Sequence, residues 1–384
     1  MKTSLIGAGA MGSGIAQVAA TSGAEVWLYD SKPEALETCR QQMEQILSRQ
    51  VEKGKKTRDQ ARDTLARTRH ARHLRAVGDS DLVIQAIVED LTVKQAVFRE
   101  LETIVSPQCL LATNTSSPSV TAIAAACQHP ERVLGIHFFN PAALMRLVEI
   151  VPAVQTHPTA WQRARQLVEG WGKKTVVAKD TPGFIVNRVA RPFYGEALRL
   201  LEEGVADAAT IDWAMTALGG FRMGPFALMD YIGHDVNYTV TETVFRAFYH
   251  DDRYRPSFTQ KKLVEAGYLG RKTGRGFYAY GEAAHHPEPL QDPSLGRQIL
   301  DRILIMLINE AADALFLGIA SRDDLDCAMT LGVNYPKGLL RWADEIGIAT
   351  CVARMDRLFA EYRETRYRCS PLLRRMAREN QTFY

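Results

Sequence analysis

The chain has 384 residues, of which 46% are hydrophobic and 24% charged, and its formal net charge is +3. This length suits two or three domains, each able to bury its own core. The net charge is too small to indicate a nucleic-acid partner, and no apolar run approaches the roughly 20 residues that cross a bilayer. We therefore expect a globular protein that binds neither nucleic acid nor membrane.

The N-terminus and the cysteines predict a cytoplasmic location. The first six residues run directly into a strand-like stretch, which leaves no room for the charged leader and apolar segment of an export signal. The six cysteines lie far apart and form no CxxC pair, so neither a disulfide framework nor a zinc site is expected. We predict reduced, mostly buried thiols and no bound metal.

Short apolar runs alternate with helical patterns over about the first 180 residues, which is the order that builds a parallel sheet covered by helices on both faces. Strands are predicted at 4–6, 25–29, 82–87, 110–113, 133–138, 147–151 and 175–178. The unusually long crossover between Asp30 and Asp81 has the patterns of two helices, about 34–53 and 58–68, which would form a hairpin. These elements predict a doubly wound α/β domain over residues 1–183.

A glycine motif, Gly7 to Gly12, follows the first strand and opens a helix. In the dinucleotide-binding fingerprint the first glycine permits a tight turn, the second lets the backbone approach the pyrophosphate, and the third lets helix and strand pack closely. The helix N-terminus adds free N–H donors and positive dipole. The residues predicted to contact the cofactor here are Gly7, Gly9, Ala10, Met11 and Gly12.

Asp30 ends the second predicted strand, 18 residues after Gly12. A carboxylate at this place accepts hydrogen bonds from the adenosine ribose hydroxyls and repels a 2′-phosphate. The sequence therefore predicts NAD rather than NADP as the cofactor. A purely structural glycine turn is the alternative, and the agreement of spacing, strand, helix and acid favours the fingerprint.

Strand signals vanish after Phe184, and helical periodicity takes over beyond the break at 181–183. Self-similarity then appears at one fixed offset of 114 residues, which predicts two copies of one helical unit. The predicted domains are 184–282 and 297–384, with a proline-marked linker at 283–296. Identical pairs include Glu196/Glu310, Leu201/Leu315, Gly204/Gly318, Asp212/Asp326, Met215/Met329, Gly224/Gly338, Asp230/Asp344 and Gly233/Gly347.

His137 lies at the carboxyl end of an apolar strand, where open parallel sheets place their ligands, and Glu149 follows twelve residues later. Removing hydride from a carbinol carbon requires loss of the hydroxyl proton, which a neutral imidazole takes near neutral pH. A carboxylate beside the ring would hold one tautomer and stabilise the imidazolium. Taken as an isolated pair, however, a hydrogen-bonded strand-end histidine and a surface charge are the commoner interpretation.

The resemblance to a known family reverses that interpretation. Segments 114–117, 135–141, 147–149, 180–188, 223–226 and 270–278 look like the signatures of the 3-hydroxyacyl-CoA dehydrogenase family, in family order. The resemblance implies a Rossmann-type domain followed by two tandem all-α domains. Within the family, the tandem helical arrangement looks closest to bacterial members that act on 3-hydroxyadipyl-CoA, and short-chain members that act on 3-hydroxybutyryl-CoA are the near alternative.

The resemblance also assigns roles to residues. His137 and Glu149 match the catalytic pair, and Ser116 and Asn187 match residues that contact the reacting thioester end and the cofactor. Lys53 matches a lysine that contacts coenzyme A, and it lies in a basic segment, Arg49 to Arg75, whose ten lysines and arginines would attract the coenzyme A phosphates. The further residues that match NAD-contacting positions are Glu89, Lys94, Asn140 and Lys272.

The implied reaction oxidises an (S)-3-hydroxyacyl-CoA to the 3-oxoacyl-CoA in fatty acid or phenylacetate breakdown. A gulonate-type hydroxyacid dehydrogenase and a non-catalytic NAD-binding protein are the alternatives. In single-copy relatives the helical domains pair between subunits, so the fused second copy predicts a monomer or a homodimer that uses another surface. Residues 141–146 depart from the family pattern, which leaves the acyl pocket wall, and thus chain-length preference, open.

Overall fold

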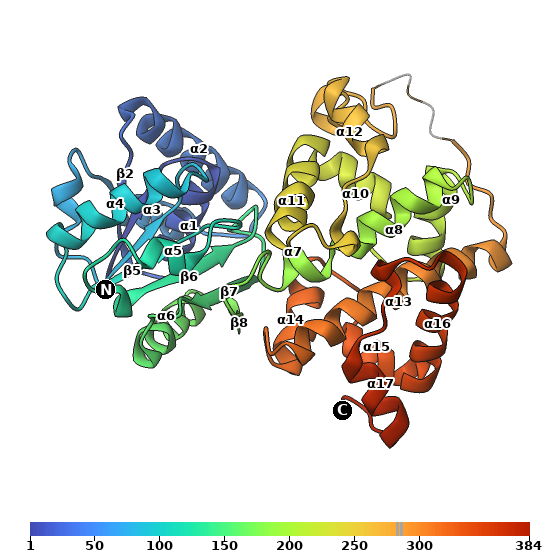
Figure 1. Cartoon of the computed structure of the whole chain (residues 1–384). Coiled ribbons are helices and arrows are strands. Elements are labelled where there is room, and N and C mark those ends of the chain that lie inside the picture. The colour runs from blue at the N-terminus through green and yellow to red at the C-terminus, as the bar shows by residue number, and fades with distance from the viewer. Residues whose placement is uncertain (282–283, 285–286) are drawn as a thin grey trace. The chain divides into compact units, whose positions relative to one another are not determined.

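The computed structural model describes residues 1–281, 284 and 287–384. Its contacts divide it into two compact units, Met1–Phe184 and Ile185–Tyr384, shown in Figure 1. Residue 282, which ends the predicted first helical domain, and residues 283, 285 and 286 of the predicted linker 283–296 lie outside the described residues. The first unit carries the sheet, and the second is helical, as the sequence predicts.

The sheet of the first unit has eight strands in the order β3-β2-β1-β4-β5-β6-β7-β8. All neighbours are parallel except β6 and β7. Residues 139–146 join that pair, and this connection is too short for the crossover of about a dozen residues that parallel strands need. The strands are β1 (Lys2–Ile6), β2 (Glu25–Tyr29), β3 (Thr68–His70), β4 (Leu82–Gln85), β5 (Leu110–Thr113), β6 (Val133–Phe138), β7 (Leu147–Pro152) and β8 (Lys174–Val177).

The helices of the first unit confirm the predicted hairpin after β2. Thr57 and Gln60 form a capping box that starts its second helix, which explains the sharp turn after the first. That helix ends at Arg67, and the following three residues form β3, which the sequence analysis missed. The helices are α1 (Ala10–Thr21), α2 (Pro33–Glu52), α3 (Arg58–Arg67), α4 (Leu91–Ile104), α5 (Val120–Ala124) and α6 (Pro158–Gly170), with 3₁₀ turns η1 (Leu74–Val77) and η2 (Pro130–Arg132).

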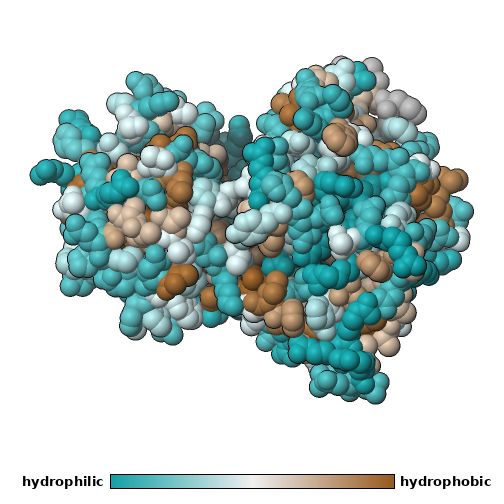
Figure 2. Space-filling model, viewed as in Figure 1, coloured by the Kyte–Doolittle hydropathy of each residue, from teal (hydrophilic) through white to brown (hydrophobic). Residues whose placement is uncertain are grey.

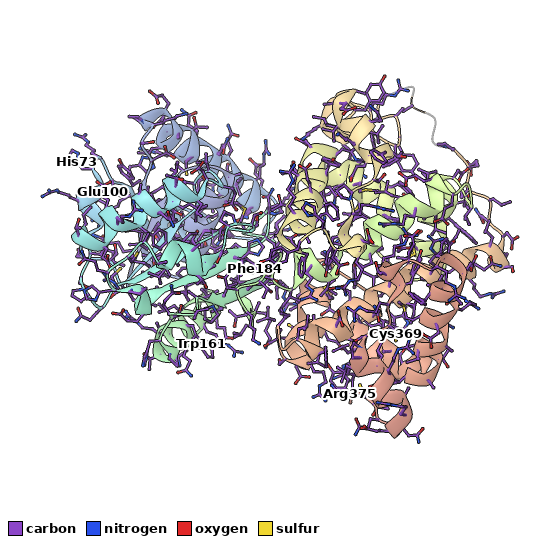
Figure 3. All side chains as sticks on the ribbon, viewed as in Figure 1. His73, Glu100, Trp161, Phe184, Cys369 and Arg375 are labelled. Carbon is purple, nitrogen blue, oxygen red and sulfur yellow. The ribbon has the colours of Figure 1, made fainter. Side chains whose placement is uncertain are left out.

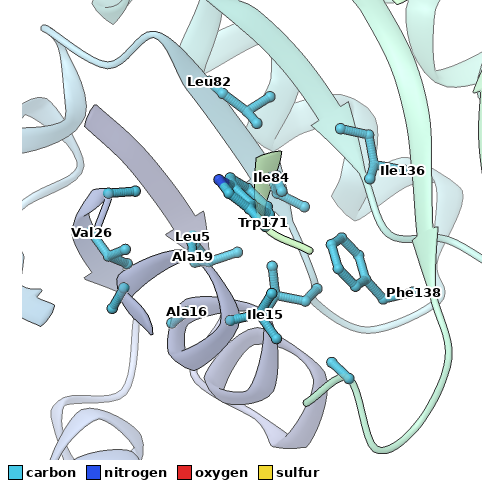
Figure 4. Packing of buried hydrophobic residues seen from close by; sticks show 14 of the residues in the cluster. Leu5, Ile15, Ala16, Ala19, Val26, Leu82, Ile84, Ile136, Phe138 and Trp171 are labelled. Atoms are coloured by element: carbon cyan, nitrogen blue, oxygen red, sulfur yellow. The ribbon is translucent and has the colours of Figure 1, made fainter. Parts of the chain in front are cut away.

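The core of the first unit packs α1 against the parallel strands (Figure 4). Leu5, Leu82 and Ile84 are fully buried on strands that read as continuous apolar runs, as expected for strands covered on both faces. Ile15 and Ala19 of α1 are also fully buried. Each large side chain buried in this way contributes about 1.5–3 kcal/mol relative to exposure. This packing fixes the end of β1 and the start of α1, where the glycine motif lies.

The second unit repeats one helical pattern. Asp212 accepts hydrogen bonds from the N–H groups of Phe226 and Ala227, and Asp326 accepts the equivalent bonds from Leu340 and Arg341. The helices are α7 (Val186–Val189), α8 (Arg191–Glu202), α9 (Ala208–Trp213), α10 (Pro225–Ile232), α11 (His234–Ala247), α12 (Phe258–Glu265), α13 (Pro293–Phe316), α14 (Arg322–Gly332), α15 (Leu339–Ile346), α16 (Ile348–Tyr362) and α17 (Pro371–Glu379), with shorter turns η3 (Ala214–Leu218), η4 (Asp252–Tyr254), η5 (Arg271–Thr273) and η6 (Thr365–Tyr367).

Buried ion pairs join the two copies crosswise. Nε of Arg188 donates to Oε1 of Glu310 at 2.6 Å, and Nε of Arg302 donates to Oε2 of Glu196 at 3.0 Å. Arg302 and Glu310 lie 114 residues after Arg188 and Glu196, so the two pairs are equivalent by the repeat. Burial alone would lower the pKa of Arg188, but the charge of Glu310, its hydrogen bond and the nearby Tyr254 together outweigh burial and raise that pKa. The copies therefore meet through two matched, desolvated charge pairs.

The polarity of the surface and the burial of the cysteines agree with what the composition predicts. Polar residues cover most of the face shown in Figure 2. All six cysteines are free, and the buried ones are Cys39, Cys109, Cys351 and Cys369, which confirms the prediction of mostly buried thiols. Among the helices of the described residues, none is long and apolar enough to cross a membrane.

Candidate active site

The glycine motif occupies the turn between β1 and α1. Gly7 has a φ of +105°, and a Cβ on it would lie 2.3 Å from the carbonyl oxygen of Ala86; a Cβ on Gly12 would lie 1.9 Å from that of Gly7. Both positions therefore require glycine. A Cβ on Gly9 would meet nothing within 4 Å, and no side chain caps the N-terminus of α1, so backbone N–H groups face open space there. This turn fits a phosphate group at a helix N-terminus.

Asp30 stands at the end of β2, beside the glycine turn. Its Oδ2 accepts a hydrogen bond from the N–H of Ala8 at 2.8 Å, and its Oδ1 accepts one from the N–H of Lys32 at 2.9 Å. These bonds fix the carboxylate next to the turn and leave each oxygen further lone pairs. The geometry fits a carboxylate that accepts hydrogen bonds from ribose hydroxyls.

The predicted catalytic pair comes together on neighbouring strands. His137 of β6 lies directly opposite Glu149 of β7 in the antiparallel register. The distance from Nδ1 of His137 to Oε2 of Glu149 is 2.7 Å, and the side chains are 7% and 0% exposed. Since Glu149 occupies Nδ1, the other ring nitrogen, Nε2, is the one that remains to exchange a proton with a substrate.

Two aromatic rings hold the imidazole of His137. The ring centroid of Phe139 lies 4.6 Å away and that of Phe184 5.7 Å away. Phe184, labelled in Figure 3, adopts a φ of +46°, which a residue other than glycine rarely does. Backbone strain of this kind concentrates at functional sites, where surrounding contacts enforce it. The rings supply an apolar wall that limits the ring orientation and excludes water.

Ser116, Glu89 and Lys94 form one hydrogen-bonded cluster near the ends of β4 and β5. Oε1 of Glu89 accepts a hydrogen bond from the N–H of Ser116 at 2.8 Å and lies 3.2 Å from its hydroxyl. Nζ of Lys94 lies 3.1 Å from Oε2 of Glu89, and Lys94 is 99% buried. Three predicted site residues therefore meet at the carboxyl edge of the sheet, where this class of fold binds ligands.

The loop that departs from the family pattern follows Asn140, which is exposed. Ala142 packs against Gly14, where a Cβ would lie 3.1 Å from that of Ala142. Nζ of Lys173 donates to the carbonyl oxygens of Ala142 and Met145 at 2.6 and 2.8 Å. Hydrogen bonds from Lys173 therefore fix this loop at Ala142 and at Met145. Leu144, which lies between them, is 71% exposed.

Asn187 and Lys272 belong to the second unit, and each is placed within that unit. Asn187 is a partly exposed residue of α7. Nζ of Lys272 lies 2.6 and 2.7 Å from the carboxylate oxygens of Asp235. Burial raises the pKa of Asp235, but the hydrogen bond from Lys272 and neighbouring groups lower it overall. The structure thus gives Lys272 an acidic partner in its own unit that the sequence analysis did not foresee.

Lys53 follows α2 and is exposed, at the tip of the basic hairpin. Other charges of the hairpin are paired on the surface: Arg62 lies 3.1 Å from Asp59 and 3.7 Å from Asp63. Exposed pairs of this kind contribute about 0–1 kcal/mol each. The few acidic residues of the hairpin neutralise only part of its positive charge. No contact within the hairpin distinguishes Lys53 from its other basic residues.

Sequence reasoning missed the residues that support the site. Phe139 and Phe184 lie within the recognised motifs, yet their contact with His137 depends on tertiary packing. Asp180, another motif residue, accepts hydrogen bonds from the N–H groups of Val120 and Thr121 and so caps α5. No local pattern signals this contact, because Asp180 lies 60 residues after Val120 in the sequence.

A dinucleotide turn with an imidazole and a carboxylate at the same sheet edge defines a nicotinamide-dependent dehydrogenase fold and site. Comparison with known families agrees. The model for the NAD-binding domain of 3-hydroxyacyl-CoA dehydrogenases matches residues 2–181, and the model for their C-terminal domain matches residues 183–280 and 299–382. The chain belongs to the 3-hydroxyacyl-CoA dehydrogenase family.

Individual relatives cover most or all of the chain. It is 39% identical to 3-hydroxyadipyl-CoA dehydrogenase of Escherichia coli K12 over 97% of this chain and 96% of that protein. It is 41% identical to 3-hydroxybutyryl-CoA dehydrogenase of Bradyrhizobium diazoefficiens over 74% and 97%. The crystal structure of 3-hydroxybutyryl-CoA dehydrogenase from E. coli K12 superposes with a TM-score of 0.93 at 37% identity, covering 99% and 98% of the two chains.

Proposed function

We propose that this chain oxidises the 3-hydroxyl of (S)-3-hydroxyacyl-CoA thioesters to a ketone with NAD. The 2.7 Å contact between His137 and the fully buried Glu149 carries the proposal, because this pair provides an oriented base at the carboxyl edge of the sheet. Bound NAD would supply the acceptor for the hydride that leaves C3. The family membership supports the same reaction.

His137 acts as the base in this proposal. Nε2 takes the proton of the 3-hydroxyl while Nδ1 stays hydrogen-bonded to Glu149. The carboxylate keeps the ring in the tautomer with a free Nε2 lone pair and stabilises the imidazolium that forms. Phe139 and Phe184 restrict rotation of the ring and keep water from competing for the proton.

The remaining site residues position the reactants. Ser116 and Asn187 hold the thioester end and align C3 for the transfer. The NAD contacts proposed in the first unit are the glycine turn with Ala10 and Met11, then Asp30, Glu89, Lys94 and Asn140. Lys272 is a further proposed cofactor contact, and it would have to share its ammonium with Asp235. Lys53 and the basic hairpin would attract the coenzyme A phosphates.

The names of the relatives support 3-hydroxyadipyl-CoA or a short 3-hydroxyacyl-CoA as substrate. We propose phenylacetate or fatty acid breakdown as the metabolic context and the cytoplasm as the location. NADH formation with a panel of 3-hydroxyacyl-CoA thioesters tests the proposal. A gulonate-type dehydrogenase would instead oxidise a free hydroxyacid, and a non-catalytic NAD-binding protein would oxidise neither. Oxidation of free acids alone would therefore overturn the proposed function.

Exchange of Asp30 for Asn is expected to raise the ratio of NADP to NAD efficiency by roughly 10-fold. The substitution keeps one oxygen that accepts from a backbone N–H, gives up the second such bond, and removes the charge that repels a 2′-phosphate. Steady-state kinetics with both cofactors measure the ratio. Asp59→Asn, on the exposed face of α3, is the control, and an equal ratio in both variants would refute the role of Asp30.

We propose that residues 1–183, 184–282 and 297–384 are three domains with a linker at 283–296. We also propose that the two helical copies bind each other within one chain. The crosswise pairs Arg188–Glu310 and Arg302–Glu196 support this, because they occupy the contact that a second subunit would otherwise need. Light scattering coupled to size exclusion should find a monomer, or a homodimer built on another surface. A dimer that depends on contacts between residues 184–282 of two chains would contradict it.

A further inference from the structure

The second unit contains a cavity that none of the predicted site residues lines. It lies between α8, α13 and α16 and has a volume of about 600 Å³, within the roughly 300–1,000 Å³ of small-molecule sites. The apolar part of its lining is Leu200, Val205, Ile299, Ile305 and Leu358. All of these except Val205 are at most 8% exposed, so buried side chains form an apolar floor.

Part of the charged lining of this cavity is paired. Arg354 of α16 lies 2.8 Å from Asp301 of α13, and this pair bridges the two helices. Arg302 of α13 lies 3.0 Å from Glu196 and 2.6 Å from Glu203. These charges are compensated within the chain and leave no demand for a further ion.

Three charged residues of the lining are unpaired. Arg297 of α13 and Arg357 of α16 are exposed, and across residues 1–281, 284 and 287–384 no carboxylate forms an ion pair with either. In the same ranges, Glu361 is the one lining carboxylate without an ion pair. Two free positive charges against one free negative charge therefore favour a ligand with a single negative charge.

Helical spacing places both free arginines along the seam between α13 and α16. Arg297 comes four residues before Asp301, and Arg357 comes three residues after Arg354. Residues three or four apart lie on one face of a helix. The faces that carry the free arginines are therefore the faces that the ion pair between Asp301 and Arg354 joins.

Two other cavities, of about 470 and 500 Å³, show the contrast. Every arginine that lines them has a carboxylate at 3.0–3.9 Å. These arginines are Arg40 and Arg62 in the first cavity, and Arg199, Arg255 and Arg366 in the second. Arginines without a carboxylate partner thus distinguish the cavity between α8, α13 and α16 from these two.

The helical repeat relates this cavity to the segment around Asn187. Asp301 stands 114 residues after Asn187, at the equivalent position of the second copy. The positions equivalent to Arg297 and Arg357 are Gly183 and Thr243, neither of which is charged. The free arginines are therefore a property of the second copy alone, and they suit a ligand other than the thioester end proposed for Asn187.

We propose that the cavity between α8, α13 and α16 is a second binding site, which takes a monocarboxylate with an apolar body, such as a medium-chain fatty acid. The planar fork of an arginine matches a carboxylate, and Arg297 and Arg357 supply two such forks. The apolar floor holds the body of the ligand. This site goes beyond the proposed dehydrogenase reaction and does not depend on it.

Titration calorimetry with three probes tests the proposal: octanoate, octan-1-ol, which lacks the charge, and inorganic phosphate, which lacks the apolar body. The wild-type chain should bind octanoate roughly 10- to 100-fold more tightly than either of the others. The double variant Arg297→Gln/Arg357→Gln should weaken octanoate binding by about 10-fold or more and leave octan-1-ol unchanged. Glu361→Gln should tighten octanoate binding about three- to tenfold, because it removes the one free like charge.

Arg375→Gln/Arg378→Gln is the matched control, because it removes two exposed arginines from α17 of the same unit and should keep the wild-type affinity for octanoate. The proposal would be overturned by wild-type binding of octan-1-ol or phosphate as tight as that of octanoate, or by no octanoate binding. An unchanged octanoate affinity in the variant at 297 and 357 would overturn it too. Failure of the wild-type chain to oxidise thioesters would instead refute the proposed function and leave this site standing.

Discussion

Replacing His137 by Gln is expected to lower kcat by about 10²- to 10⁴-fold, the contribution typical of a general base. Glutamine keeps a polar group of similar reach beside Glu149 but has no lone pair of suitable basicity for the 3-hydroxyl proton. NADH formation at saturating thioester measures the loss. KM for NAD should change little, since the imidazole contacts the reacting end only.

His129→Gln is the control for that experiment, because its side chain is 61% exposed and lies 3.4 Å from Glu131 on the surface. It should retain the wild-type kcat. Glu149→Gln should lie between the two, because an amide still orients the ring but no longer stabilises the imidazolium. A His137→Gln variant within threefold of wild type would show that the proton leaves by another route.

Replacing Glu310 by Gln should destabilise the second unit by about 3–5 kcal/mol, the usual cost of breaking a buried ion pair from one side. Glu310 is 99% buried and accepts hydrogen bonds from Arg188 at 2.6 Å, Arg253 at 3.3 Å and the hydroxyl of Tyr254 at 2.6 Å. Loss of its charge leaves two buried guanidinium groups with less compensation. Denaturant unfolding, followed by a probe in the second unit, measures the change.

Glu242→Gln provides the comparison, because Glu242 forms an exposed i,i+4 pair with Arg246 at 3.0 Å. That pair contributes about 0.3–0.5 kcal/mol, so the control should unfold almost as the wild type does. If Glu310→Gln also unfolded within 1 kcal/mol of wild type, the buried network would not hold the two copies together.

The sequence was sufficient for the parts of the fold that local pattern determines. Alternating apolar runs located the strands, and fixed spacing revealed the helical repeat. The short connection of residues 139–146 also indicates that β7 runs antiparallel to β6, because a parallel crossover needs about a dozen residues. Strand β3 could not be predicted, because Thr68, Arg69 and His70 have no apolar pattern and pair only where β2 offers an edge.

The residues of the candidate site likewise fall into those that sequence spacing predicts and those that only tertiary packing brings together. His137, Glu149 and the glycine turn sit at strand ends, which sequence spacing identifies. The contacts of Glu89 with Ser116, and of Lys272 with Asp235, depend on side chains that are 27 and 37 residues apart and are fixed only by tertiary packing.

The crosswise pairs have a consequence for how such a chain arises. Because each helical copy carries both an acid, Glu196 or Glu310, and a base, Arg188 or Arg302, one copy alone already contains both halves of a self-complementary contact. Two identical ancestral chains would satisfy each other through the same pairs. In this chain both pairs form within one molecule.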